Sequence, residues 1–561
     1  MPPMSEQRTA SRNSERLLAA RCSLLAMLIQ DLWYKNAVVY CVNVETFLDT
    51  NGDGIGDFEG LMRRLDYLAG LGVTCLWLLP FYPSPRRDDG YDVADYYGVD
   101  PRYGTSGDFV EFLRQADSRG IRVVVDLVIN HTSIKHPWFR ERPEWYVWSK
   151  RRPRGWNKGM VFPPEQKSTW SYDAEARAWY FHRFFDFQPD LNTALPEVRA
   201  EIKRIMGYWL ELGVSGFRLD ALPFVISSKG PDVRPRHDFE FLREMREFVQ
   251  WRRGDAVLLA EANVLPNADL DYLGEDDDRM HMMFNFLVNQ NLFYALASAD
   301  TRPLVRALER TRQRPMTAQW GHFLRNNDEL DLGRLTDAQR ELVFEKFAPE
   351  PKEHLYRRGV RRRLAPMLDG DRKRMELAYS LMFTLPGTPV FRYGDELGMG
   401  DDLSLPDRQA FRTPMQWSNE RHGGFSTAKR TVLPVLDDDV FGYRRVNAAD
   451  QRRDPNSFLN WTERIIRLRK ELPEIGWGDR RVLATGSPHV LAIRYDWRDN
   501  AIIAAHNVDA KPHTARIAAA GKLVNLLSDD HSDGGKVAIE GYGYRWYRVG
   551  GQREISNRER A

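Results

Sequence analysis

Cysteine is scarce in this sequence, and the charges of the two signs nearly balance. The three cysteines, Cys22, Cys41 and Cys75, lack the spacing of a metal or redox motif, so we expect a reduced, cytoplasmic protein. With 81 basic and 79 acidic residues, the formal charge of +2 gives no global field that would favour nucleic acid or a membrane surface. The basic run at residues 356–366, YRRGVRRRLAP, lies near many acids and is interpreted as a solvated helix face.

Long hydrophobic runs are absent as well. The most apolar early segment, residues 17–29, is interrupted by Arg21 and is too short to cross a bilayer. We therefore expect no membrane-spanning segment. Because Met27 leads directly into the first strand-like segment, residues 1–26 are predicted to be a disordered extension.

Aromatic residues, in contrast, are abundant. The chain has 16 Trp and 22 Tyr, and several lie beside acids and amides in polar segments such as 78–104 and 169–192. An aromatic face suits the C–H-rich face of a sugar, and carboxylates or amides suit its hydroxyl rim, so this pattern favours a carbohydrate ligand. Most of these rings are nevertheless expected to serve as core or loop packing.

Residues 49–60 read DTNGDGIGDFEG, a pattern typical of an oxygen-ligand loop for a hard cation. Position twelve of the loop is Gly60 instead of a bidentate Glu, and the preceding segment alternates like a strand, so a helix–loop–helix calcium sensor is not favoured. Two hypotheses remain, a structural Ca2+ clip and a metal-free Asx/Gly turn. The candidate metal ligands are four side chains and one main-chain carbonyl: Asp49, Asn51, Asp53, Asp57 and the carbonyl of Ile55.

Short apolar runs rich in β-branched residues alternate with helical periods along most of the chain, which predicts a parallel sheet buried on both faces. Four of these predicted strands end in polar residues, and in a (β/α)8 barrel such ends converge on one face, where active sites lie. Acids delivered to one rim by several strands favour a catalytic site. The strand-end residues are Asp126, Asn130 and His131, then Arg218 and Asp220, then Glu261, then Asn326 and Asp328.

Four strings, DLVINH, GFRLDA, LLAEAN and FLRNNDE, occur in an order and at spacings that resemble those of the α-amylase family, glycoside hydrolase family 13. Supporting strings are GYDVADY, QPDLN and FRTPMQW, and the resemblance covers about residues 31–550. Within the family, the chain is most similar to the trehalose synthase and oligo-α-glucosidase branches. The resemblance implies a (β/α)8 TIM barrel, with a small domain inserted after the third strand and a C-terminal antiparallel β-sandwich.

The resemblance also implies roles for individual residues. Asp220 matches the nucleophile, Glu261 the general acid/base, and Asp328 the third carboxylate that holds the 2- and 3-hydroxyls of the sugar. It implies that the 49–60 loop binds a structural Ca2+ and that no organic cofactor is needed. The residues implied to bind substrate are Tyr91, Asp92, His131, Arg218, Asn327 and Arg412.

Retaining cleavage of a glycoside needs an ionised nucleophile and a protonated acid about 5–5.5 Å away. Arg218 would face the same side of its strand as Asp220 and is expected to keep the nucleophile ionised. Glu261 lies in an apolar strand, which is expected to raise its pKa. The two carboxyl groups are therefore predicted to have well-separated pKa values.

Two positions depart from the family pattern. Asn327 stands where relatives usually carry a His that contacts the sugar hydroxyls, so we expect reduced or altered activity. Arg392 stands where relatives often carry Tyr and is expected to change the shape of the acceptor side.

The predicted domain layout follows from the resemblance. The ranges are 1–26 for the extension, 27–131 for the first part of the barrel, 132–192 for the inserted domain, 193–479 for the second part of the barrel, 480–550 for the β-sandwich and 551–561 for a polar tail.

Three hypotheses for the function follow. The first is a retaining hydrolase or transglucosylase that acts on maltose-type α-glucosides through a covalent β-glucosyl-aspartate. The second is a trehalose synthase, which would isomerise maltose without water, and the third is a non-catalytic sugar-binding relative. All three imply a small α-glucoside as the partner, with no nucleic acid and no membrane. The presence of all three carboxylates argues against the third hypothesis. Overall similarity favours the trehalose synthase branch, but the departures at Asn327 and Arg392 weaken that assignment, so we choose the first hypothesis and keep the second as the alternative.

Overall fold

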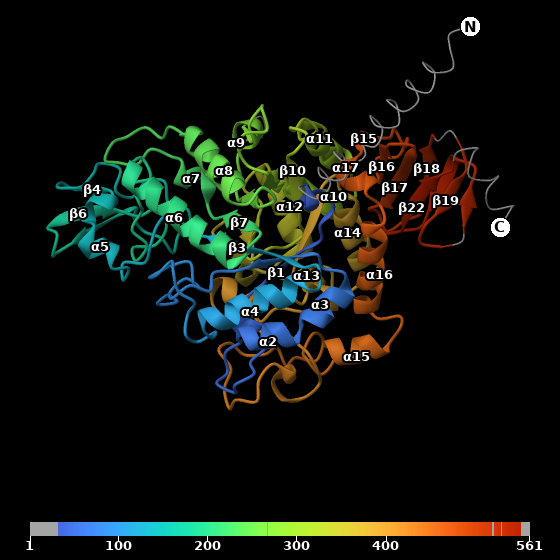
Figure 1. Cartoon of the computed structure of the whole chain (residues 1–561). Coiled ribbons are helices and arrows are strands. Elements are labelled where there is room, and N and C mark those ends of the chain that lie inside the picture. Colours follow the sequence, from blue (N-terminus) through green and yellow to red (C-terminus); the bar gives the residue numbers. More distant parts are fainter. Residues whose placement is uncertain (1–31, 266–267, 519–520, 529, 551–561) are drawn as a thin grey trace, which may run out of the picture.

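Eight parallel strands close into a barrel in this computed structural model, which describes residues 32–265, 268–518, 521–528 and 530–550 (Figure 1). The predicted extension 1–26 and tail 551–561 lie outside the described residues. Around the barrel the strand order is β1-β14-β10-β9-β8-β7-β3-β2. The barrel strands are β1 (Val39–Val42), β2 (Cys75–Leu78), β3 (Arg122–Leu127), β7 (Gly216–Leu219), β8 (Val257–Ala260), β9 (Met282–Phe284), β10 (Gln319–His322) and β14 (Thr388–Arg392).

The barrel strands are buried on both faces, which explains why they read as continuous apolar runs. In β1, for example, Val39 and Cys41 pack in the barrel interior, whereas Tyr40 and Val42 pack against the surrounding helices. Cys41 and Cys75 are both buried free thiols, and burial raises the pKa of Cys75 to about 12. These two cysteines are therefore packing residues and not reactive nucleophiles.

Helices with well-defined caps follow the strands and cover the barrel. Helix α4 begins with a capping box formed by Thr105 and Asp108. Helix α6 begins with Pro196 and is capped at its C-terminal end by Gly213, whose φ is 114°. The helices are α2 (Phe58–Arg63), α3 (Leu65–Leu71), α4 (Ser106–Asp117), α6 (Pro196–Leu212), α7 (Leu222–Val225), α8 (Glu240–Arg252), α9 (Asp269–Leu273), α10 (Phe286–Ser298), α11 (Arg302–Arg310), α12 (Asp337–Phe347), α13 (Leu364–Met367), α14 (Arg372–Thr384), α15 (Ala448–Arg453), α16 (Phe458–Lys470) and α17 (Glu474–Trp477).

A small antiparallel sheet is inserted between β3 and α6. Its strand order is β4-β6-β5, and it lies to one side of the barrel together with α5 (Trp138–Glu141) (Figure 1). The chain enters the insertion near His131 and leaves it near Asp190, and these two residues form an isolated antiparallel bridge. We call these two segments the chain crossings. The strands are β4 (Trp148–Ser149), β5 (Trp170–Asp173) and β6 (Ala178–Phe181).

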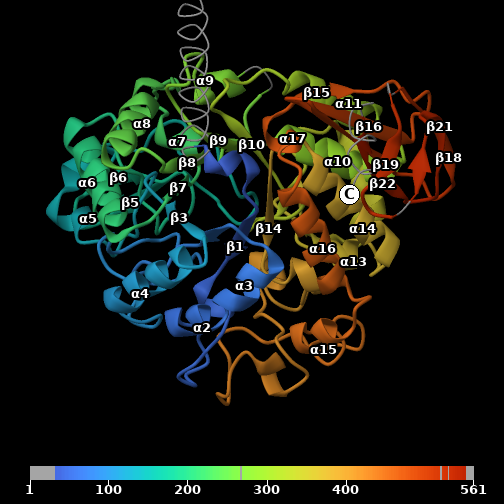
Figure 2. The same ribbon diagram turned by 45° about the vertical axis from the view of Figure 1, so that its right-hand side comes forward.

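The C-terminal strands form a six-stranded antiparallel sheet, β15-β16-β17-β22-β19-β20, and a separate pair, β18-β21. Figure 2 shows them on the side of the barrel opposite to the insertion. Their bounds are β15 (Asp479–Val482), β16 (Val490–Trp497), β17 (Asn500–Asn507), β18 (His513–Ile517), β19 (Leu523–Asn525), β20 (His531–Ser532), β21 (Gly535–Ile539) and β22 (Tyr544–Val549). Across the described ranges, no helix has both the length and the apolar character needed to cross a bilayer.

The basic run 356–366 is not a solvated helix face, as its sequence had suggested. It contains β13 (Gly359–Val360) of a small sheet with β11 (Leu330–Asp331) and β12 (His354–Leu355), followed by the buried helix α13. Arg363 is 2% exposed and donates to the carbonyls of Phe411 and Tyr393. Arg358, Arg361 and Arg363 therefore hold neighbouring loops by binding main-chain oxygens.

Candidate active site

The guanidinium of Arg218, on β7, lies at the centre of the polar cluster at the C-terminal rim of the barrel. It is fully buried, and its Nη1 donates to Asp126 and to Asp220, at 2.7 Å each. Its Nη2 lies 2.7 Å from Glu261 and 4.0 Å from Asp328. The four strand ends that the sequence analysis singled out therefore meet around one cation.

The local backbone of β7 explains how Asp220 and Glu261 come together. Gly216 has φ 146°, and a Cβ at this position would lie 2.2 Å from the carbonyl oxygen of Val257 on β8. Only glycine allows β7 and β8 to approach this closely. Just after Asp220, the chain turns at Ala221, which has φ 47° and donates its amide to Glu261 at 3.1 Å.

The predicted separation of the two pKa values is wrong. Burial raises the pKa of both Asp220 and Glu261 to about 7, because the attraction of Arg218 is shared and the neighbouring carboxylates repel added negative charge. The same burial raises the pKa of Asp126 to about 6. One guanidinium faces three carboxyl groups at close range, so the cluster retains a proton near neutral pH.

Asp328 differs from its neighbours because more cations surround it. Burial raises its pKa, but Arg408 and Arg412, each 3.3 Å from Oδ1, together with Arg218 outweigh burial and hold the pKa below its usual value. Asp328 therefore stays ionised beside carboxyl groups that hold a proton. Arg412 also donates to the main-chain oxygen of Asn327, so it orients the strand end that carries Asp328.

A cavity of about 660 Å3 opens above this cluster, within the ~300–1,000 Å3 range of small-molecule sites. Asp220, Glu261 and Asp328 all line it, as do Tyr91 and His131. Of the other residues predicted to bind substrate, Arg218, Asp92, Asn327 and Arg412 lie behind the lining. Residues that line the cavity but were not predicted as site residues include Asp88, Phe162, Asn326, Arg334 and Arg408.

Asp92 does not reach the cavity, which corrects its expected role as a sugar ligand. Its carboxylate accepts hydrogen bonds from Ser84 Oγ and from the amides of Arg87 and Asp88 and thereby shapes the loop. Asp88, four residues earlier, lines the cavity instead and accepts from Gln188 at 2.8 Å. Burial raises the pKa of Asp88 to about 6.

His131 is held in one tautomer. Its Nε2 lies 3.1 Å from the carbonyl oxygen of Tyr91, which can only accept, and its Nδ1 lies 3.2 Å from Asn130 Nδ2, which can only donate. Burial lowers the pKa of His131 to about 4, so the ring is neutral at physiological pH. It therefore supplies a fixed, uncharged face beside the carboxylate cluster.

The two departures from the family pattern have different consequences. Asn327 is buried, its Nδ2 donates to Tyr91 Oη at 3.3 Å, and its Oδ1 has no hydrogen-bond partner. Its short side chain stays behind the cavity lining. Arg392 is also buried and hydrogen-bonds the Phe411 carbonyl and the Tyr393 hydroxyl. It therefore supports the rim from beneath and does not shape the acceptor side, contrary to expectation.

Val161, Phe162, Arg358 and Arg408 line the cavity, and Tyr356 packs on Phe162. We call these five residues the roof. The ring of Phe162, from the insertion, packs on Tyr356 at 4.6 Å between centroids and lies 4.7 Å below the guanidinium of Arg408. Arg358 donates to the carbonyl of Val161 at 2.9 Å. The insertion is thus fixed to the barrel side of the cavity by both apolar and polar contacts.

A second tie holds the base of the insertion. Lys229, from the segment after α7, is buried, and its Nζ lies 3.0 Å from Asp190 Oδ2. It also donates to Asn130 Oδ1 at 2.8 Å and to the carbonyl oxygens of Asn130 and Leu191. These acceptors lie where the chain enters and leaves the insertion, so one ammonium group fixes both crossings next to His131.

The 49–60 loop has the donor chemistry of a calcium loop, and hydrogen bonds hold two of its carboxylates in place. The Asp49 carboxylate accepts hydrogen bonds from the main-chain amides of Asn51, Gly52 and Gly54. The Asp57 carboxylate accepts hydrogen bonds from the amides of Thr50 and Gly60. The carboxylates of Asp49, Asp53 and Asp57 do not all lie within 4.8 Å of one another. Calcium binding at this loop stays a prediction.

The chain matches the family model for the catalytic domain of α-amylase over residues 42–346 and 360–478. It is 43% identical over 489 residues to the trehalose synthase of Thermus thermophilus, which covers 85% of this chain and 50% of that protein. It is also 43% identical over 474 residues to the trehalose synthase/amylase TreS of Mycolicibacterium smegmatis, which covers 82% and 80% of the two chains. The chain thus spans about half the length of the first relative.

Other relatives are more distant. Identity is 30% to an α-glucosidase of Pediococcus pentosaceus, over 86% of this chain and 93% of that protein. Among solved structures, an inactive double mutant of MutB in complex with isomaltulose has a TM-score of 0.75 at 26% identity, covering 92% of this chain and 99% of that chain. The chain belongs to the α-amylase family, glycoside hydrolase family 13, and is an enzyme of that family.

Replacing Glu261 by glutamine should stabilise the protein at alkaline pH. Folding raises the pKa of Glu261 from 4.5 to about 7, so the wild type loses stability as the pH rises through this interval. Glutamine does not titrate. We expect Glu261→Gln to be more stable than the wild type by on the order of 1–3 kcal/mol at pH 8 and nearly equal at pH 4.5. Urea unfolding at both pH values would measure this, with Glu341→Gln, an exposed site on α12, as the control.

Calcium should raise the melting temperature of the full chain if the 49–60 loop closes around the ion. In that case Asp53→Ala, which removes an exposed loop carboxylate, should reduce the shift, and Mg2+ should not replace Ca2+. An identical melting temperature with Ca2+ and with a chelator would favour the metal-free turn.

Proposed function

We propose that this protein interconverts maltose and trehalose by intramolecular glucosyl transfer through a covalent intermediate on Asp220. The observation that carries the proposal is the 43% identity with two trehalose synthases over 82–85% of the chain, against 30% with an α-glucosidase. This favours the isomerase over the hydrolase or transglucosylase that the sequence alone had favoured. A non-catalytic role is not favoured, because all three family carboxylates line the cavity.

In the proposed first step, a carboxylate oxygen of Asp220 attacks C1 of the bound glucosyl unit. The C1–O bond to the second glucose breaks, and Glu261 gives its proton to the departing oxygen. A pKa near 7 suits Glu261 to this role, since the group is still partly protonated at neutral pH. Asp328, held ionised by three arginines, would stabilise the positive charge that develops at C1.

In the second step, the released glucose presents its anomeric hydroxyl to C1 of the intermediate. Glu261 takes the proton of that hydroxyl while the ester to Asp220 breaks, so trehalose forms and no water is consumed. Water that enters the cavity at this stage would instead release free glucose. The balance between isomerisation and hydrolysis therefore depends on how well the cavity excludes water.

The roof supports this proposal. Phe162, Tyr356 and neighbouring apolar side chains form one cluster across the insertion and the segment at 355–356, and Arg408 and Arg358 add polar contacts to it. Contacts of this kind would hinder both the exit of a released glucose and the entry of water.

Incubation of the purified protein with maltose, with products resolved by chromatography, tests the proposal. We expect trehalose as the main product and free glucose as a minor one. Asp220→Asn should lose both products by about 10^4-fold or more, because the covalent intermediate can no longer form. Glucose as the main product, with no trehalose, would contradict the isomerase and restore the hydrolase hypothesis.

Loosening the base of the insertion should increase the leak to water. We expect Lys229→Met to raise the ratio of glucose to trehalose several-fold, because the two chain crossings at Asn130 and Leu191 lose their shared donor. Removing one partner of a buried ion pair costs about 3–5 kcal/mol, so the double variant Lys229→Met/Asp190→Asn, which leaves no unpaired charge, serves as a second test.

Lys203→Met provides the matched control, since Lys203, on α6, forms a partly exposed ion pair with Glu244, on α8. It should leave the product ratio unchanged. A wild-type product ratio in folded Lys229→Met and in the double variant would show that this tie does not control water access.

A further inference from the structure

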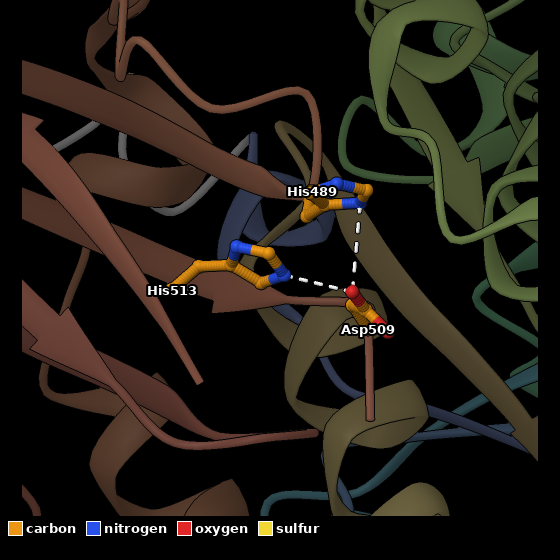
Figure 3. Close-up of side chains that lie close together, drawn as sticks. All are labelled: His489, Asp509 and His513. Atoms are coloured by element: carbon orange, nitrogen blue, oxygen red, sulfur yellow. Dashed lines mark hydrogen bonds and ion pairs between the residues drawn. The ribbon is translucent and has the colours of Figure 1, made fainter. Parts of the chain in front are cut away.

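Two histidines and an aspartate gather in the C-terminal part of the molecule, far along the chain from the catalytic cluster. His489 precedes β16, Asp509 follows β17, and His513 begins β18 (Figure 3). One nitrogen of each imidazole and one oxygen of Asp509 lie within 4.8 Å of one another. Within the described part of the chain, this is the one group of three or more such side chains that comes so close.

The geometry of the cluster resembles that of a preformed site. His513 Nε2 lies 2.7 Å from Asp509 Oδ2, and His489 Nδ1 lies 3.9 Å from the same oxygen (Figure 3). The two imidazole rings are stacked, with centroids 4.2 Å apart and planes inclined by 24°. His513 therefore hydrogen-bonds the carboxylate, and a nitrogen of His489 lies near the same oxygen.

The backbone that carries these side chains is fixed by other interactions. Asp509 accepts the amide of Tyr542 on its carbonyl, and its own amide donates to Asn507 Oδ1. His489 accepts the amide of Val508 on its carbonyl, and His513 pairs with Ile539 in the β18-β21 ladder. Bringing the ligands together would thus cost little conformational entropy.

The side chains are partly accessible. Their exposed fractions are 33% for His489, 22% for Asp509 and 23% for His513, so an ion can enter and water can complete its coordination. Two imidazole nitrogens and one carboxylate oxygen are a donor set that Zn2+ and related divalent metals prefer, whereas Ca2+ prefers oxygen alone.

His489 also makes a contact with which a metal would compete. Its Nδ1 lies 2.6 Å from the carbonyl oxygen of Ala299, which can only accept, so Nδ1 carries the proton in the metal-free state. A metal bound at Nδ1 would displace that proton, so the hydrogen bond to the Ala299 carbonyl would be lost. The neighbouring hydrogen bonds from Thr301 to the carbonyl of Pro488 would still hold the α10–α11 turn against the C-terminal domain.

We propose that His489, Asp509 and His513 bind one divalent cation of the Zn2+ class. The ion would link the segment before β16 to the β17–β18 turn, which stabilises the C-terminal sheets. The site is separate from the oxygen-ligand loop at 49–60 and does not depend on the proposed catalytic function.

Titration of the chelator-treated full chain with ZnCl2 by calorimetry tests this proposal. We expect one equivalent of saturable binding that CaCl2 does not compete away, together with a rise in melting temperature. His513→Gln and Asp509→Asn should each weaken binding on the order of 100-fold, because each removes a direct ligand.

His531→Gln, which alters an exposed histidine in the same domain, is the control and should bind Zn2+ like the wild type. Co2+ in place of Zn2+ should give a visible absorption that is lost in His513→Gln. The proposal is overturned if no saturable binding occurs, or if binding persists unchanged in folded His513→Gln and Asp509→Asn, which would assign it to scattered surface side chains.

Discussion

The buried guanidinium of Arg218 is the interaction on which the site and the closure of the barrel both depend. It has no access to solvent, so its charge must be matched by the carboxylates that the neighbouring strands supply. Those carboxylates are carried by β3 and by the chain immediately after β7 and β8. Without any of them the guanidinium would be a buried, unpaired charge, at a cost of about 3–5 kcal/mol, whereas loss of a single one relieves an excess of negative charge. The fold therefore tolerates a highly charged rim only because this one cation joins three strands.

The same arrangement explains why the rim is suited to chemistry. More carboxyl groups than cations meet in a buried space, so raised pKa values and a retained proton follow from electrostatics. A transition state that carries positive charge at C1 relieves the excess of negative charge, which stabilises it relative to the empty site. The destabilisation of the free enzyme and the stabilisation of the transition state are thus two consequences of one charge imbalance.

The barrel and the central cluster could be predicted because strand ends with acids follow local sequence rules. Two strands could not, since β9 has three residues and β14 contains Pro389, which is unusual within a sheet. The choice between Asp88 and Asp92 was also beyond the sequence. Both acids lie in one loop, and the hydrogen bonds from Ser84 and from main-chain amides decide which one faces the cavity. Which acid faces the cavity thus depends on tertiary contacts, which composition and residue spacing do not reveal.

The roof shows why product specificity is harder to predict than reaction type. The strings that identify the catalytic carboxylates lie on barrel strands, whereas the roof combines an insertion, the basic run 356–366 and Arg408. Arg358, in the run that the sequence suggested to be a solvated face, binds the carbonyl of Val161 and the carboxylate of Asp331. Arg408, about which the sequence suggested nothing, binds acids and aromatic rings. If water access depends on these contacts, as the proposed function requires, enzymes with the same central cluster can differ in whether glucose or a new disaccharide leaves the site.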